Sequence, residues 1–86
     1  MKHASTNALG KLEDVLKKLR QTKLLKEKST GIFYKKSQAF LHFHEDSKGL
    51  FADLKVESSW KRFPVNTKQE KDYFLREVYK LTKIHL

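Results

Sequence analysis

Two histidines stand two residues apart in the stretch AFLHFHED at residues 39–46, and they are the side chains of this chain best suited to chemistry. In a β-strand, which rises about 3.3 Å per residue, His42 and His44 would leave the same face about 6.5 Å apart. If the next strand pairs as described below, Asp53 lies opposite His42, with about 5 Å between their β-carbons. Two imidazoles and a carboxylate are a ligand set for zinc, or for a non-haem iron with open positions.

The same three residues also have a purely structural interpretation. His-x-His pairs recur by chance in strands, and the sequence assigns no further ligand. His42 and Asp53 would then form an ordinary cross-strand pair, with His44 packed beside Phe51. We favour this interpretation over a metal site, and the sequence predicts no cofactor.

The middle of the chain predicts three antiparallel strands, at residues 31–35, 38–45 and 50–56, each rich in aromatic or branched side chains and bounded by polar turns. The alternation also predicts the register, because a slip of one residue would mix apolar and polar partners on both faces. The expected cross-strand pairs are Tyr34–Ala39, Phe33–Phe40 and Ile32–Leu41 in the first hairpin, and Phe43–Ala52, Leu41–Leu54 and His42–Asp53 in the second.

This register predicts a sheet with two unlike faces. One face is almost entirely apolar and should be covered by helices; it holds Ile32, Tyr34, Ala39, Leu41, Phe43, Ala52, Leu54 and Val56. The other face is mixed, so any binding site should lie on it; it holds Phe33, Lys35, Phe40, His42, His44, Phe51, Asp53 and Lys55.

Two amphipathic helices should flank the strands. Apolar residues at three- and four-residue spacing predict the first helix between Leu9 and Leu25. The sequence Thr67-Lys-Gln-Glu70 is a capping box, in which the Thr hydroxyl and the Glu carboxylate each accept a hydrogen bond from an otherwise unpaired backbone amide. It should begin a second helix that runs to about Ile84.

Pro64 should keep residues 58–65 out of the centre of the sheet, as an extended edge or as a cover over part of it. The predicted fold class is therefore α+β, an antiparallel meander of three strands, or four, flanked by an N-terminal and a C-terminal helix in the order α-β-β-β-α. Residues 1–86 should form this one domain, with residues 1–8 as a flexible N-terminal segment.

The composition excludes several classes of protein. The 86 residues include no cysteine, which excludes a disulfide framework, a zinc ribbon and a thiol nucleophile. Three glycines form no phosphate-binding loop. No apolar run reaches the roughly 20 residues that span a bilayer, and the first residues lack the apolar segment of a secretory signal. We therefore expect a cytoplasmic protein without a membrane partner.

The net charge of +9 is concentrated at the two ends of the chain. Residues 1–30 carry eight basic and three acidic side chains, residues 61–86 carry seven and three, and the middle is neutral. A nucleic-acid-binding protein would use the first helix, with Lys17, Lys18, Arg20 and Lys23 as phosphate contacts. Solvated helix faces that keep the protein soluble explain the same charge, and we favour this explanation.

Phe33, Phe40 and Phe51 would form an aromatic surface on the mixed face, with Lys35 and Lys55 beside them. Sheets of this kind stack single-stranded bases, but the nearby acidic residues Glu45, Asp46, Asp53 and Glu57 cancel the lysines here. An uncovered patch of three phenylalanines is large for a monomer and usually marks an interface. We therefore rank burial or self-association as a homodimer first, another partner or ligand second, and nucleic acid third.

The run FYKKSQAFLHFHED at residues 33–46, followed by GLFAD at 49–53 and FPVNT at 63–67, resembles a group of small uncharacterised bacterial proteins. The resemblance spans about residues 31 to 80 and is most specific through the hairpin. It implies a bacterial origin, but no activity, cofactor or partner, so no functional residues follow from it.

These observations predict a small, non-catalytic binding or interaction module rather than an enzyme. Its working surface should be the mixed face, at Phe33, Phe40, His42, His44, Phe51 and Asp53. The alternatives are a basic nucleic-acid-binding protein that uses the first helix, and a metal-dependent enzyme built on His42, His44 and Asp53.

Overall fold

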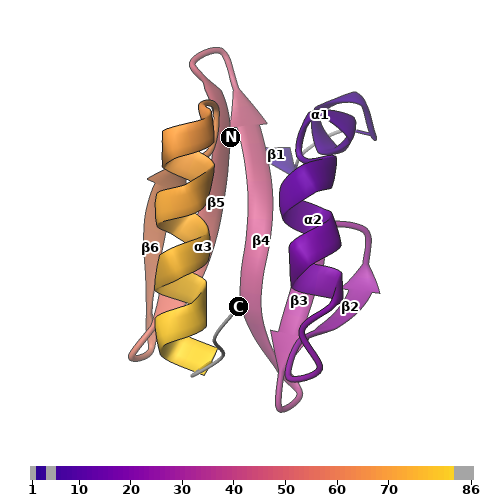
Figure 1. Cartoon of the computed structure of the whole chain (residues 1–86), viewed down its shortest axis with the longest axis vertical. Helices are drawn as coiled ribbons and strands as arrows, with labels where there is room; N and C mark the ends of the chain where they lie inside the picture. The colour runs from indigo at the N-terminus through magenta and orange to yellow at the C-terminus, as the bar shows by residue number, and fades with distance from the viewer. Residues whose placement is uncertain (1, 4–5, 83–86) are drawn as a thin grey trace.

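A computed structural model describes residues 2–3 and 6–82, and shows an antiparallel sheet with helices against it (Figure 1). The predicted α+β class is confirmed, but the meander has five strands, in the order β2-β3-β4-β5-β6, with the short β1 paired to β4. The elements are β1 (Lys2–His3), α1 (Thr6–Lys11), α2 (Glu13–Arg20), β2 (Lys26–Ser29), β3 (Ile32–Lys35), β4 (Gln38–Asp46), β5 (Gly49–Val56), β6 (Ser59–Pro64) and α3 (Lys68–Thr82).

The N-terminal part of the chain differs from the single helix predicted between Leu9 and Leu25. The helix is interrupted at Leu12, whose amide donates to the Leu9 carbonyl at 3.0 Å, and α2 ends at Arg20. The chain then turns into β2, which pairs with β3. Residues 2–3 and 6–8, expected in a flexible segment, belong to β1 and α1, whereas residues 1 and 4–5 of that segment lie outside the described residues.

The first predicted hairpin is correct only at its turn. Tyr34 lies opposite Ala39 as expected, but Phe33 lies opposite Leu41 and Ile32 opposite His42, because a β-bulge makes Phe40 an extra residue of β4. A bulge of one residue reverses which face the rest of the partner strand presents. Ile32 and Tyr34 therefore share the face of His42, and Phe33 turns to the other side.

The second hairpin is confirmed as predicted. Its register pairs Leu41 with Leu54, Phe43 with Ala52 and His42 with Asp53 across a two-residue turn. The segment that carries Pro64 is the edge strand β6, which pairs with β5 and brings Arg62 opposite Asp53. An edge position suits a residue that has no amide proton to donate.

Helices α2 and α3 both lie on one face of the sheet (Figure 1). They enclose the core there: Phe74 of α3 packs against Phe43 and Phe63, with ring centroids 6.1 and 5.6 Å apart. The predicted capping box begins α3, since the Glu70 amide donates to Thr67 Oγ1 and the Thr67 amide donates to the Glu70 carboxylate, both at 3.1 Å. No helix of the described residues has the length and apolar character needed to cross a membrane.

We call the opposite side of the sheet the histidine face. Cross-strand pairing and alternation assign side chains from all five strands of the meander to it. Its members include Lys26, Ile32, Tyr34, His42, His44, Phe51, Asp53, Lys55, Trp60 and Arg62.

Candidate functional site

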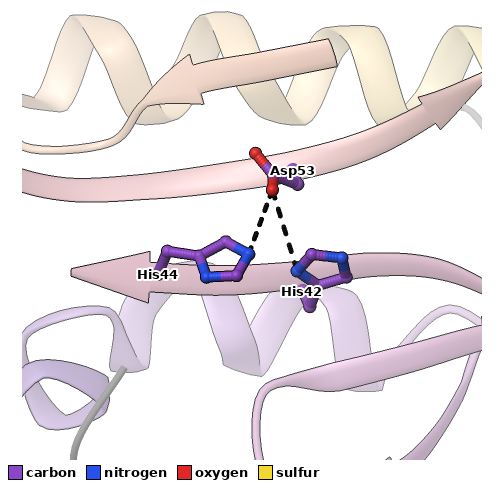
Figure 2. Close-up of side chains that lie close together, drawn as sticks. All are labelled: His42, His44 and Asp53. Carbon is purple, nitrogen blue, oxygen red and sulfur yellow. Dashed lines mark ion pairs between the residues drawn. The ribbon is translucent and has the colours of Figure 1, made fainter. Parts of the chain in front are cut away.

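Two neighbouring strands, β4 and β5, bring His42, His44 and Asp53 together on the histidine face. Figure 2 shows both imidazoles directed at a single oxygen of Asp53. That oxygen, Oδ2, lies 3.0 Å from His44 Nε2 and 3.9 Å from His42 Nδ1. The prediction that both histidines share a face, with Asp53 across from His42, is therefore confirmed.

Arg62 on β6 completes this cluster from the other side of Asp53. Its Nε donates to Oδ1 at 2.7 Å and its Nη2 donates to Oδ2 at 2.9 Å, the two-point contact for which a guanidinium is well shaped. The sequence prediction did not place Arg62 beside Asp53, because it treated residues 58–65 as an edge or a cover and assigned them no register. The alternation of residues 59–64 was the available signal, since it places Arg62 on the face opposite Phe63.

The Asp53 carboxylate is buried, with 7% of the residue exposed, so its charge has to be stabilised by its neighbours. Burial alone would raise the pKa of Asp53, but the hydrogen bonds and charge of Arg62, with smaller contributions from His44 and His42, outweigh it. The pKa of Asp53 therefore lies below its ordinary value, and the group is a carboxylate at neutral pH.

Trp60 adds an exposed aromatic ring to the cluster. Its ring centroid lies 4.5 Å from that of His42, which in turn lies 4.6 Å from that of His44. Lys55, opposite Trp60 in the register, places its Nζ 5.8 Å from the centre of the indole. Because 45% of Trp60 is exposed, this edge of the site is open to a planar ligand.

The predicted phenylalanine surface does not form. Phe51 lies on the histidine face opposite His44, but Phe33 and Phe40 are in the core, with 0% and 6% exposed. The bulge explains both corrections, because it reverses β3 and turns the extra residue inward. Lys35 also lies on the helix side, where its Nζ donates to the Leu81 carbonyl at 3.2 Å.

The basic residues predicted on the first helix are divided by the structure. Lys17, Lys18 and Lys23 are exposed. Arg20 forms ion pairs with Glu27 at 2.6 Å and with Glu13 at 3.1 Å, and the pair with Glu27 connects α2 to β2. Lys17 and Lys18 on α2 and Lys23 in the turn after it are therefore available, but not the arginine that best recognises a phosphate.

A second group of cations lies on the histidine face and was not predicted. Lys26 on β2 is the cross-strand partner of Tyr34, and Lys28 places its Nζ 4.5 Å from the centre of the Tyr34 ring. With Lys55 beside Trp60, lysines and aromatic rings are therefore neighbours at two places on this face.

The cluster has the donor atoms of a cation site. His42, His44 and Asp53 each offer one ligand atom, and these atoms lie within 4.8 Å of one another. No family model, curated protein or solved structure matches the chain, so its function has to be argued from the site itself.

Proposed function

We propose that the protein is a small non-catalytic binding module that holds single-stranded nucleic acid on the histidine face. Bases would stack on Trp60, and lysines of the same face would contact the phosphates. The observation that carries this proposal is the exposed indole, which stands beside His42 and Lys55 on a sheet whose other face is packed against helices.

Base stacking is the interaction for which Trp60 is best placed. A base stacked on an aromatic side chain contributes about 1–3 kcal/mol and requires no particular sequence, because every base has a π-face. Tyr34, on the same face of the sheet, is a second aromatic ring, and a base that stacks on it would displace Lys28 from over the ring towards the phosphates. Two separated stacking positions suit an extended strand better than a single nucleotide.

The local charge also favours a polyanion. Asp53, which had been expected to cancel the lysines of this face, is buried and already neutralised by Arg62. Lys26, Lys28 and Lys55 are therefore available to phosphates, and the net charge of +9 raises the affinity of the whole molecule for any polyanion.

Self-association through this face, which the sequence analysis ranked first together with burial, is less well supported by the positions of the phenylalanines. That expectation depended on three exposed phenylalanines, of which Phe33 and Phe40 are in the core. The remaining apolar surface is interrupted by charged and imidazole side chains, so it does not form the continuous apolar patch that typically marks an interface.

The test uses the fluorescence of Trp60, the single tryptophan of the chain. We expect oligothymidylate or oligouridylate of about 12 nucleotides to quench it, with weaker binding of the matched duplex and of heparin. If three lysines each neutralise one phosphate, affinity should fall about twentyfold between about 50 and 200 mM salt. Equal binding of heparin, duplex and single strand, without a change in Trp60 fluorescence, would refute the proposal.

Two pairs of variants then locate the contact. By anisotropy of a labelled oligonucleotide, Trp60→Ala should weaken binding about 5- to 150-fold, the equivalent of one stacked base. Tyr73→Ala is the matched control, because Tyr73 is similarly exposed, at 50%, but lies on α3. Lys55→Gln should weaken binding more than Lys17→Gln, and the reverse result would move the contact to the helices.

A further inference from the structure

We propose that His42, His44 and Asp53 form a binding site for a divalent transition-metal ion, such as Zn²⁺, Ni²⁺ or Cu²⁺. This site goes beyond nucleic-acid binding and does not depend on it. Two neutral imidazoles and a carboxylate are the donor set that such ions prefer, and the absence of thiolates makes Cu(I) and iron–sulfur clusters poor candidates.

The separations between the ligand atoms suit a metal ion. Ligand bonds of about 2.1 Å in a tetrahedral site hold the ligand atoms about 3.4 Å apart. The distances from Asp53 Oδ2 to His44 Nε2 and His42 Nδ1, 3.0 and 3.9 Å, lie on either side of that value. All three ligand atoms lie within 4.8 Å of one another, so the side chains have to rotate and shorten the widest separation when the ion binds.

The strands make the placement of these ligands rigid. His42 and His44 are alternate residues of β4, and the β4–β5 register sets Asp53 directly across from His42. Both β4 and β5 are internal strands of the sheet, with a hydrogen-bonded neighbour on each side. A site built on internal strands is more precisely held than one on loops.

Arg62 is the feature that would set the affinity. Its Nη2 lies 2.9 Å from Oδ2, the same oxygen that both histidines approach, so a metal ion and this guanidinium compete for one atom. Arg62 can move away from Oδ2, because 46% of its side chain is exposed. Its other hydrogen bond, from Nε to Asp53 Oδ1, does not involve the oxygen that the histidines approach. We therefore expect moderate affinity in the native chain and tighter binding once the guanidinium is removed.

Three protein ligands leave at least one coordination position of the metal for water or another small ligand. Trp60 stands over His42 on the exposed side of the cluster, so a bound ion should alter the fluorescence of this one tryptophan. The fluorescence of Trp60 therefore reports whether a metal ion is bound.

The experiment is a titration of the full chain, freed of metal by a chelator, with Zn²⁺ and Ni²⁺. We expect saturable 1:1 binding by calorimetry, shifts of the His42 and His44 imidazole signals in NMR spectra with Zn²⁺, and quenching of Trp60 with Ni²⁺. Absence of any shift of these imidazole signals at millimolar Zn²⁺ would overturn the proposal, and this measurement needs no variant.

Variants test the assignment of the ligands. His44→Asn and Asp53→Asn should each weaken Zn²⁺ binding at least tenfold, because each removes one of three ligands. Arg62→Gln should tighten it about tenfold, whereas Arg20→Gln, which removes an arginine ion-paired elsewhere, should leave it unchanged. Binding that survives His44→Asn but is lost in His85→Asn, or that weakens in Arg62→Gln, would overturn the proposal.

Discussion

Replacing Asp53 by Asn measures how much the cluster contributes to the free energy of unfolding. The substitution keeps the shape of the side chain, but removes the charge that accepts two hydrogen bonds from Arg62 at 2.7 and 2.9 Å. Hydrogen bonds to charged groups contribute about 1.5–3 kcal/mol each when buried. Because the Arg62 side chain is 46% exposed, solvent screens the pair, and we expect a total loss of about 1–2 kcal/mol.

The loss should depend on pH in a defined direction. The pKa of Asp53 in the folded protein lies below its value in the unfolded chain, which is about 3.9. The stabilisation by the carboxylate is therefore fully present above about pH 4 and disappears as the pH falls through the lowered pKa of the folded state. Wild type and Asp53→Asn should differ at pH 7, and the difference should shrink as the pH falls below about 4.

Urea unfolding at several pH values measures both effects. In thermal unfolding at pH 7 the same loss corresponds to a fall in Tm of roughly 5–15 °C for a domain of this size. Asp72→Asn is the control, since Asp72 pairs with the exposed Lys68 at 3.4 Å and its replacement should cost less than about 0.5 kcal/mol. A loss no larger than that of Asp72→Asn, or one that does not diminish at any pH below about 4 at which the protein still folds, would contradict the reasoning.

Three further predictions test the packing that positions the site. In urea unfolding, Phe33→Ala should cost about 3–5 kcal/mol and Phe51→Ala only about 1, because the bulge turns Phe33 into the core; similar losses would contradict that assignment. Gly49→Ala should cost about 1–3 kcal/mol, because φ is +130° there and an added Cβ would lie 2.5 Å from Asn66 Oδ1; unchanged stability would argue against this close approach. Thr67→Ala should cost about 1 kcal/mol by removing the cap of α3, and a neutral result would argue that the cap is dispensable.

The part of the site that could be predicted from sequence is the part that strict alternation controls. From Leu41 to Phe43, and again from Ala52 to Leu54, each apolar residue is followed by a histidine, an aspartate or a lysine, so only one register buries the apolar set. The shared face of the imidazoles and the position of Asp53 follow from that pattern alone. The capping box was equally predictable, because its hydrogen bonds are local.

The remaining features depend on interactions that local patterns do not contain. Alternation could not determine which of Ile32, Phe33 and Tyr34 faces the core, because all three are apolar or aromatic. The β-bulge determines that Phe33 does. The strand β2, with the sequence KEKS, has no apolar residue to indicate a strand. It is held by pairing with β3 and by the ion pair of Arg20 with Glu27, and both are tertiary contacts.

Arg62 connects the two proposals, because a metal ion on Asp53 Oδ2 would displace the hydrogen bond that Arg62 Nη2 donates to this oxygen and weaken the hold of Asp53 on the guanidinium. A metal ion on Oδ2 would release the guanidinium to the exposed edge of the histidine face, beside Trp60, where it adds a cation for phosphates. Metal binding and oligonucleotide binding should then strengthen each other, and linkage requires the two enhancements to be equal. In Arg62→Gln this coupling should vanish although the metal ion and the oligonucleotide each still bind. That result would distinguish the displacement of Arg62 from a general effect of the added metal charge.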